Sequence, residues 1–105
     1  MTEALRPRHY QTLFRNFPEF MRALDGVAQA VRGSGPLDEK TIQLVQLGAA
    51  AALGSETAVA SHARRAGQAG ATPVEINQSL LALTTTIGFP SVAAALKWVQ
   101  KHLEE

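Results

Sequence analysis

The chain has 105 residues and a formal net charge of +1, and its 18% of charged residues is below the roughly 25% of an average soluble domain. The absence of cysteine excludes disulfides, zinc–thiolate sites and thiol catalysis, and no basic stripe of the kind that binds nucleic acid is present. The longest nearly apolar stretch, residues 44–53, is well short of the about 20 residues that a membrane-spanning helix needs.

We expect a single domain over residues 1–105, because a chain of this size buries one core and leaves little room for a second. The N-terminal stretch lacks the apolar segment of a signal peptide, and a cytoplasmic location fits this pattern. The low charge content is a mild indication of a subunit interface, since fewer side chains are suited to bulk water.

Two helices are predicted before residue 33. The first is short, and Phe17-Pro18 separates it from the second, because proline fits the first turn of a helix. The second helix has apolar residues spaced i, i+4, i+7, i+8 and i+11, namely Phe20, Leu24, Val27, Ala28 and Val31. These residues share one face, and the glycine-rich stretch 32–36 follows as a loop.

The next helix is predicted to begin after Asp38, a good N-cap, and to end at Gly54. It is apolar almost all round, so we expect it to be the central and most buried helix. Gly48 and the alanines after it are small enough to let neighbouring backbones approach closely. A further helix, capped by Ser55, is predicted to end at Gly70.

The last third of the chain is also helical in its pattern. Thr72-Pro73-Val74-Glu75 is a capping box with proline at the first helical position. Apolar residues then continue on one face as far as Ile87, and Gly88-Phe89-Pro90 interrupts the chain before a last helix. Because no segment alternates with period two, we predict an all-α fold of five to six helices.

His62 is the candidate catalytic residue. It lies within a predicted helix among small side chains, at i+7 from Ser55 and i+4 from Ala58. Burial would lower its pKa and keep the imidazole neutral near pH 7, ready to act as a base. The alternative is a core or interface histidine with a structural role only. His9 and His102 are expected to be solvated.

The candidate substrate-binding residues are Arg65, Arg64, Gln43 and Ser55. The two arginines are adjacent and point about 100° apart on a helix, so only one shares a side with His62, where it would clamp an anionic substrate. The alternative is a solvated arginine, or one paired with Glu56 or Asp38. Gln43 interrupts an apolar helix, and a buried amide needs partners, so it is expected at a pocket or an interface.

The run LDEKTIQLVQLGAAAALGSETAVASHARRAGQAGATPVEI, continued by SLLALTTTIGFPSVAAALKWV, resembles the carboxymuconolactone decarboxylase family, which includes the alkylhydroperoxidase D-like proteins. The resemblance covers about residues 17–99. It implies an alkylhydroperoxidase D-like helical bundle that assembles as a homo-oligomer, such as a trimer or a hexamer.

The peroxidase branch of this family carries the motif Glu-x11-Cys-x2-Cys-x3-His. When His62 is placed on the motif histidine, Ser55 and Ala58 occupy the two cysteine positions and Gln43 occupies that of the glutamate. A dithiol peroxidase needs a thiolate to attack the peroxide and a second thiol to resolve the product. The resemblance therefore does not extend to peroxidase activity.

The decarboxylase branch also lacks the cysteine pair and keeps the histidine. The resemblance implies loss of CO2 from a lactone diacid without a metal or an organic cofactor, with His62 as general acid/base. The expected partner is a small anionic organic substrate, and neither nucleic acid nor a membrane is expected. The alternative is a catalytically silent member that acts as an oligomeric binding or scaffold protein.

Overall fold

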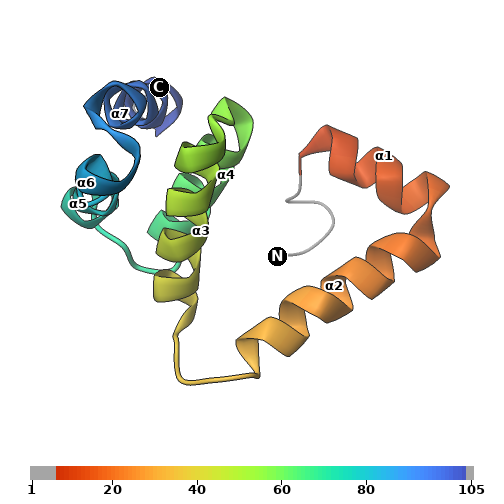
Figure 1. Cartoon of the computed structure of the whole chain (residues 1–105). Coiled ribbons are helices and arrows are strands. Elements are labelled where there is room, and N and C mark those ends of the chain that lie inside the picture. Colours follow the sequence, from red (N-terminus) through yellow and green to blue (C-terminus); the bar gives the residue numbers. More distant parts are fainter. Residues whose placement is uncertain (1–6, 104–105) are drawn as a thin grey trace. The chain divides into compact units, whose positions relative to one another are not determined.

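A computed structural model describes residues 7–103 (Figure 1). These residues form helices joined by short loops, and no β-strand is present among them. Among these residues, six helices have nine residues or more, and one further helix has four residues. Their bounds are α1 Arg8–Asn16, α2 Pro18–Arg32, α3 Glu39–Leu53, α4 Glu56–Gln68, α5 Pro73–Leu81, α6 Thr84–Ile87 and α7 Phe89–Leu103. The predicted all-α class is confirmed.

The chain divides into two compact units, and the division lies between Pro36 and Leu37. The single domain over residues 1–105 therefore stays a prediction, and each unit is described by itself. Within residues 7–103, the structure contains no helix that is both long and apolar enough to cross a membrane.

The first unit contains α1 and α2. Pro18 opens α2 as predicted, and Met21 is buried at 2% exposure. The predicted apolar face of α2 is present, and α1 does not cover it. Its four large side chains, Phe20, Leu24, Val27 and Val31, are 65%, 46%, 60% and 49% exposed.

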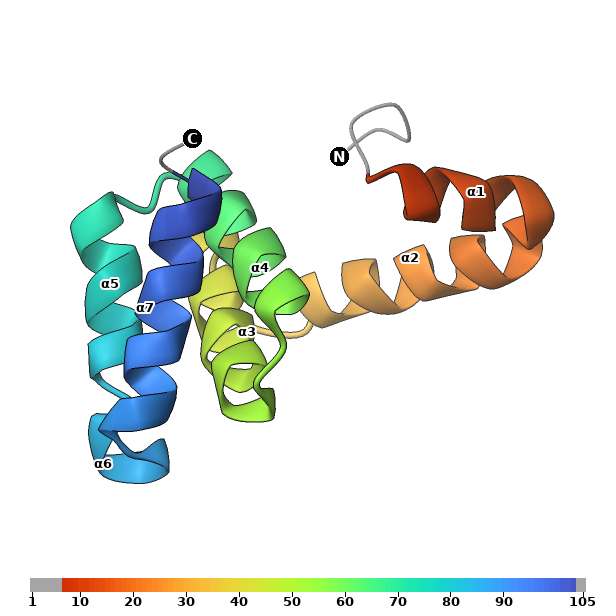
Figure 2. The ribbon, with the colours of Figure 1, turned by 90° about the horizontal axis from the view of Figure 1, so that it is seen from above.

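The second unit packs α3 and α4 side by side, with α5 against α3, and α7 against α4 and α5 (Figure 2). Its core lies among these four helices and consists mainly of small and aliphatic side chains. Leu47, Val59, Ala63, Leu80 and Ala95 are fully buried members of it. The small residues of α3 and α4 bring the elements that carry Gln43 and His62 together.

The predicted starts of α3 and α4 and the predicted end of α3 are confirmed. Asp38 accepts from the backbone of Thr41 at 2.8 Å, and Ser55 caps α4 in the same way. Gly54 ends α3 with a φ of +70°, a left-handed conformation that glycine adopts without steric cost. Local side-chain chemistry thus fixes where α3 and α4 begin.

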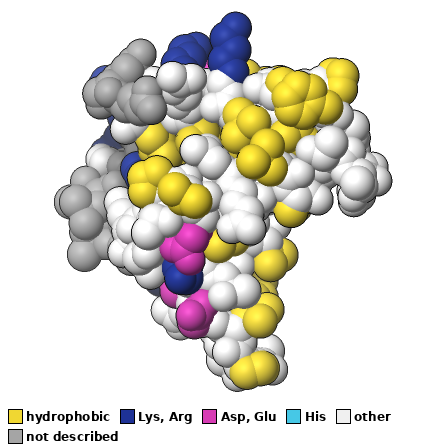
Figure 3. Space-filling model, turned by 90° about the vertical axis from the view of Figure 1, so that its left-hand side faces the viewer, with side chains coloured by type: hydrophobic (Ala, Val, Ile, Leu, Met, Phe, Trp, Pro, Cys, Tyr) yellow, Lys and Arg dark blue, Asp and Glu magenta, His cyan; other side chains and the backbone are white. Residues whose placement is uncertain are grey.

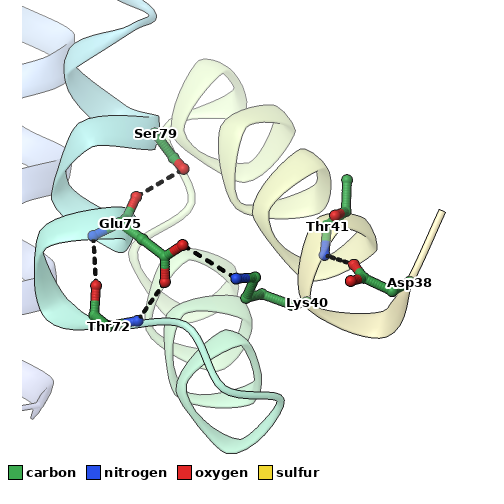
Figure 4. A network of polar contacts seen from close by, with 6 residues as sticks. All are labelled: Asp38, Lys40, Thr41, Thr72, Glu75 and Ser79. Carbon is green, nitrogen blue, oxygen red and sulfur yellow. Dashed lines mark hydrogen bonds and ion pairs between the residues drawn. The ribbon is translucent and has the colours of Figure 1, made fainter.

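A polar network joins the first turn of α3 to the first turn of α5 (Figure 4). The Glu75 carboxylate accepts from the Thr72 backbone N–H at 2.9 Å, and the Thr72 hydroxyl accepts from the Glu75 N–H at 3.1 Å. Lys40 reaches from α3 and donates to the other carboxylate oxygen at 3.1 Å. The capping box of one helix therefore also holds the start of another.

The structure corrects two expectations, one about the length of a helix and one about the packing at Gly48. The apolar face predicted to run on to Ile87 is broken, because α5 ends at Leu81 and a separate turn, α6, follows. No backbone atom of a neighbouring element lies within 4 Å of the Cβ position at Gly48, so the close approach expected at this glycine is absent. An added Cβ would first meet a methyl group of Leu83, at the ordinary contact distance of 3.5 Å.

Candidate functional site

His62 lies on α4 and faces Gln43 on α3. Its ring is partly buried, and its Nδ1 lies 2.9 Å from Oε1 of Gln43. The partner is a side chain from the neighbouring helix, 19 positions away in the sequence. The packing of α3 on α4 therefore brings together two of the residues that the sequence singles out.

Gln43 is the buried polar residue among residues 37–103, with 1% of its surface exposed. Its Nε2 donates to Oε1 of Glu39, one turn earlier on α3, at 2.8 Å. Both ends of the amide are engaged, as a buried amide requires. The result is a continuous chain of side chains, Glu39–Gln43–His62, that runs from the exposed start of α3 to the imidazole.

Glu39 is a site residue that the sequence analysis missed. The signal was present, because residues four apart on a helix are neighbours and glutamine pairs well with an acidic side chain at that spacing. An acidic residue just after an N-cap, however, is commonplace for its interaction with the helix dipole. Its second role becomes visible only once Gln43 is seen to be buried.

The electrostatics around His62 favour the neutral imidazole. Burial lowers the pKa of His62, and the positive charge of Arg65 lowers it further. The effect of a nearby positive charge on His62 distinguishes Arg65 from Arg64. Arg65 follows His62 by three positions and so lies on nearly the same side of α4, whereas Arg64 points away by about 200°.

The remaining candidates lie as follows. Ser55 is two turns from His62, and its hydroxyl accepts from the backbone of Ala58 at 3.3 Å. Arg64 is partly buried on α4, and His9 is exposed on α1. His102 is exposed, but its Nε2 is 2.8 Å from Glu56, which also binds Lys101 at 3.2 Å. Glu56 is thus paired with α7 and not with the arginines considered from the sequence.

A separate apolar groove of about 550 Å³ lies between α5 and α7. Its lining includes Ile76, Leu81, Leu96 and Val99, with the amides of Asn77 and Gln100, but not His62. Figure 3 views the molecule from the left-hand side of Figure 1, where α5 and α7 are drawn. Hydrophobic side chains gather over the upper part of the face that Figure 3 shows. Within residues 7–103, no three His, Asp or Glu side chains converge as metal ligands would.

The sequence pattern of the carboxymuconolactone decarboxylase family matches residues 18–101. The chain is also 30% identical over 97 residues to the uncharacterized protein MJ1511 of Methanocaldococcus jannaschii, a match that covers 92% of this chain and 91% of the relative. No solved structure matches the chain significantly.

Proposed function

The chain belongs to the carboxymuconolactone decarboxylase family, and from this premise we propose that it is a cofactor-independent enzyme of the decarboxylase type. Its substrate is a small lactone or carboxylic acid, and His62 is the general acid/base. We further propose a cytoplasmic protein that binds a small anionic organic substrate.

The observation that carries this proposal is the setting of His62. A histidine that serves only to fill a core is expected to be sealed by apolar neighbours or bonded to a backbone carbonyl. His62 instead bonds the buried side chain of Gln43, is partly exposed, and has an arginine on its side of the helix. A neutral imidazole beside a cation suits proton transfer on a carboxylate-bearing molecule.

In the proposed reaction, the bond between the departing carboxylate carbon and the lactone carbon breaks and CO2 leaves. The electron pair of that bond passes into the conjugated carbonyl system of the substrate, which gives an enol or enolate. His62 takes up a proton from solvent water and delivers it to the carbon of this enol or enolate, so that one proton replaces the CO2 that leaves. Arg65 holds the carboxylate that remains, and Arg64 and Ser55 are further candidates for substrate contacts. Gln43, whose buried amide is engaged at both ends, serves the site through His62.

A thiol peroxidase mechanism is excluded by the residues that stand at the cysteine positions of that branch. Ser55 is the N-cap of α4, and its hydroxyl has far too high a pKa to act as a thiolate does. Ala58 has no nucleophile. Neither residue resolves a peroxide product, so no peroxidase activity is expected.

The uncovered face of α2 favours a second candidate function. A catalytically silent family member that acts as an oligomeric binding or scaffold protein would need an apolar surface of this kind, and would not need His62. Self-association through α2 is compatible with both functions, and we propose a homo-oligomer, such as a trimer or a hexamer, in either case.

The test is thermal unfolding of wild type and His62→Ala with a panel of lactones, keto acids and dicarboxylates. A compound at 100 times its Kd stabilises the fold by about 2.7 kcal/mol, which raises Tm by several degrees. We expect such a shift, and CO2 release from the same compound, to be lost in His62→Ala and kept in His9→Ala. If no compound raises the Tm of wild type, the result favours the hypothesis of a catalytically silent family member.

A further inference from the structure

We propose that Glu39 and Gln43 are positioning residues that dictate which nitrogen of His62 gains and loses the proton, and that this nitrogen is Nε2. The inference rests on the proposed role of His62 as general acid/base. It adds the atom that does the chemistry and two residues that act through another side chain. Three hydrogen-bonding constraints lead to it.

The first constraint orients the Gln43 amide. An ionised carboxylate has no proton to donate, so it accepts only. Glu39 lies 2.8 Å from one end of the Gln43 side chain, and that end must therefore be the NH2 group. The amide of a glutamine is otherwise ambiguous, since its nitrogen and oxygen are nearly the same size. The neighbouring charge removes this ambiguity.

The second constraint fixes the imidazole. With its NH2 turned to Glu39, Gln43 presents its carbonyl oxygen to Nδ1 of His62 at 2.9 Å. A carbonyl oxygen accepts only, so Nδ1 must carry a hydrogen. A neutral imidazole has a single N–H, and Nε2 is therefore left with its lone pair. When His62 takes up a proton, that proton goes to Nε2 and later leaves from there.

The third constraint keeps this arrangement in place. Gln43 is 1% exposed, so its amide cannot exchange its partners for water without uncovering the core. Glu39 occupies the first turn of α3, which is fixed on one side by the Asp38 cap and on the other by the Lys40–Glu75 ion pair (Figure 4). The orienting carboxylate is thus carried by an anchored turn.

An amide at position 43 also has an electrostatic consequence. A carboxylate there would fix the same tautomer but would stabilise the imidazolium and raise the pKa of His62. The Gln43 amide selects the nitrogen without adding a charge next to the ring, and the negative charge stays one turn further away on Glu39. This arrangement leaves the lowering of the His62 pKa by burial intact.

The experiment is nitrogen NMR of ring-labelled histidine in the full chain, above the titration of His62. Protonated and bare ring nitrogens resonate far apart, so each tautomer has its own signature without any substrate. In wild type we expect Nδ1 to be protonated and Nε2 to be bare. In Gln43→Leu the ratio of the two His62 tautomers should reverse towards the Nε2–H form that histidine favours in water. The control is Gln46→Leu, the same change one turn along α3, which should leave the tautomer ratio unchanged.

Glu39 is tested by a pair of variants. Glu39→Ala removes the acceptor and lets the Gln43 amide turn, so the Nδ1–H form should be lost as the major form. Glu39→Gln keeps a carbonyl acceptor at the same place and should restore it. A purely structural Glu39 would leave the tautomer unchanged in both.

An Nε2–H tautomer in wild type, or an unchanged tautomer in Gln43→Leu, would overturn the proposal. Because the signal needs no substrate, it is independent of whether any lactone is turned over. Failure of the proposed enzyme activity and failure of the tautomer assignment are therefore separate outcomes.

Discussion

His62 is held in an environment that opposes its charged form, and this has a consequence for stability. Its pKa in the folded chain lies below the ordinary value of 6.5, through burial first and the charge of Arg65 second. Between these two values the unfolded chain binds more protons than the folded chain, so the free energy of unfolding rises with pH. The contribution of His62 is complete above pH 6.5 and is lost as the pH falls towards its folded pKa.

We therefore expect the free energy of unfolding to fall more between pH 7.5 and pH 5.5 for wild type than for His62→Gln. Urea unfolding at the two pH values measures this difference, and any constant cost of the substitution cancels. The window lies above the ordinary carboxyl value of 4.5, so Glu56 and Glu75, whose pKa values are lowered, contribute little in it. Equal pH dependence in wild type and His62→Gln would contradict the expectation.

At this scale the sequence identifies the residues but not their contacts. His62 stands out as a histidine among small side chains, and Gln43 as an amide in an apolar helix. Their 2.9 Å contact depends on how α3 and α4 are rotated against each other, which no local pattern encodes. The sequence also predicts that only one arginine shares a side with His62. Helical spacing selects Arg65, three positions further on, and the structure agrees, because the charge of Arg65 lowers the pKa of His62.

At the scale of the helix, two glycines of α3 have opposite roles. Gly54 ends the helix at φ +70°, where a side chain is strained whatever space surrounds it. Gly48 has ordinary helical geometry, and a Cβ there would make a normal contact with Leu83. The same substitution should therefore change stability in opposite directions at positions six residues apart.

We expect Gly54→Ala to destabilise the protein by about 1–2 kcal/mol, the cost of a left-handed conformation for a residue with a Cβ. Gly48→Ala should stabilise it by about 0.5–1 kcal/mol, because alanine loses less conformational freedom in a helix. Thermal unfolding followed by circular dichroism resolves both, since 1 kcal/mol shifts Tm by about 4–8 °C in a small domain. Gly67→Ala, at a helical position with open space, controls for helix propensity alone, and a loss of stability in Gly48→Ala would show that Leu83 cannot adjust.

The helix ends are predictable from the sequence because caps are local chemistry. Asp38, Ser55 and Thr72 each satisfy backbone groups a few residues away, and each begins a helix in the structure. The break after Leu81 is not predictable in this way, since the apolar spacing continues through it and neither glycine nor proline marks it. The spacing of apolar residues alone does not distinguish one long helix from a helix that is followed by a separate helical turn.

At the scale of the whole molecule, the charge content and the surface of α2 point the same way. Only 18% of the residues are charged, and one face of α2 carries four large apolar side chains that α1 does not cover. Contiguous apolar surface of this kind marks interaction sites in soluble proteins. The composition favours the proposed interface without locating it, and the exposed positions make this face of α2 the candidate for it.

We expect Val27→Glu to weaken self-association by about tenfold or more. Val27 is 60% exposed, so the charge should not disturb the fold of the single chain, yet it would be buried against a second copy in the assembly. Burial of a valine contributes about 1.5–3 kcal/mol, and 1.4 kcal/mol is a factor of ten in Kd. Gln29→Glu adds the same charge to the opposite side of α2 and should leave association unchanged. Sedimentation velocity over a concentration series distinguishes these outcomes, and a wild-type monomer at every concentration would show that the face of α2 serves a different partner.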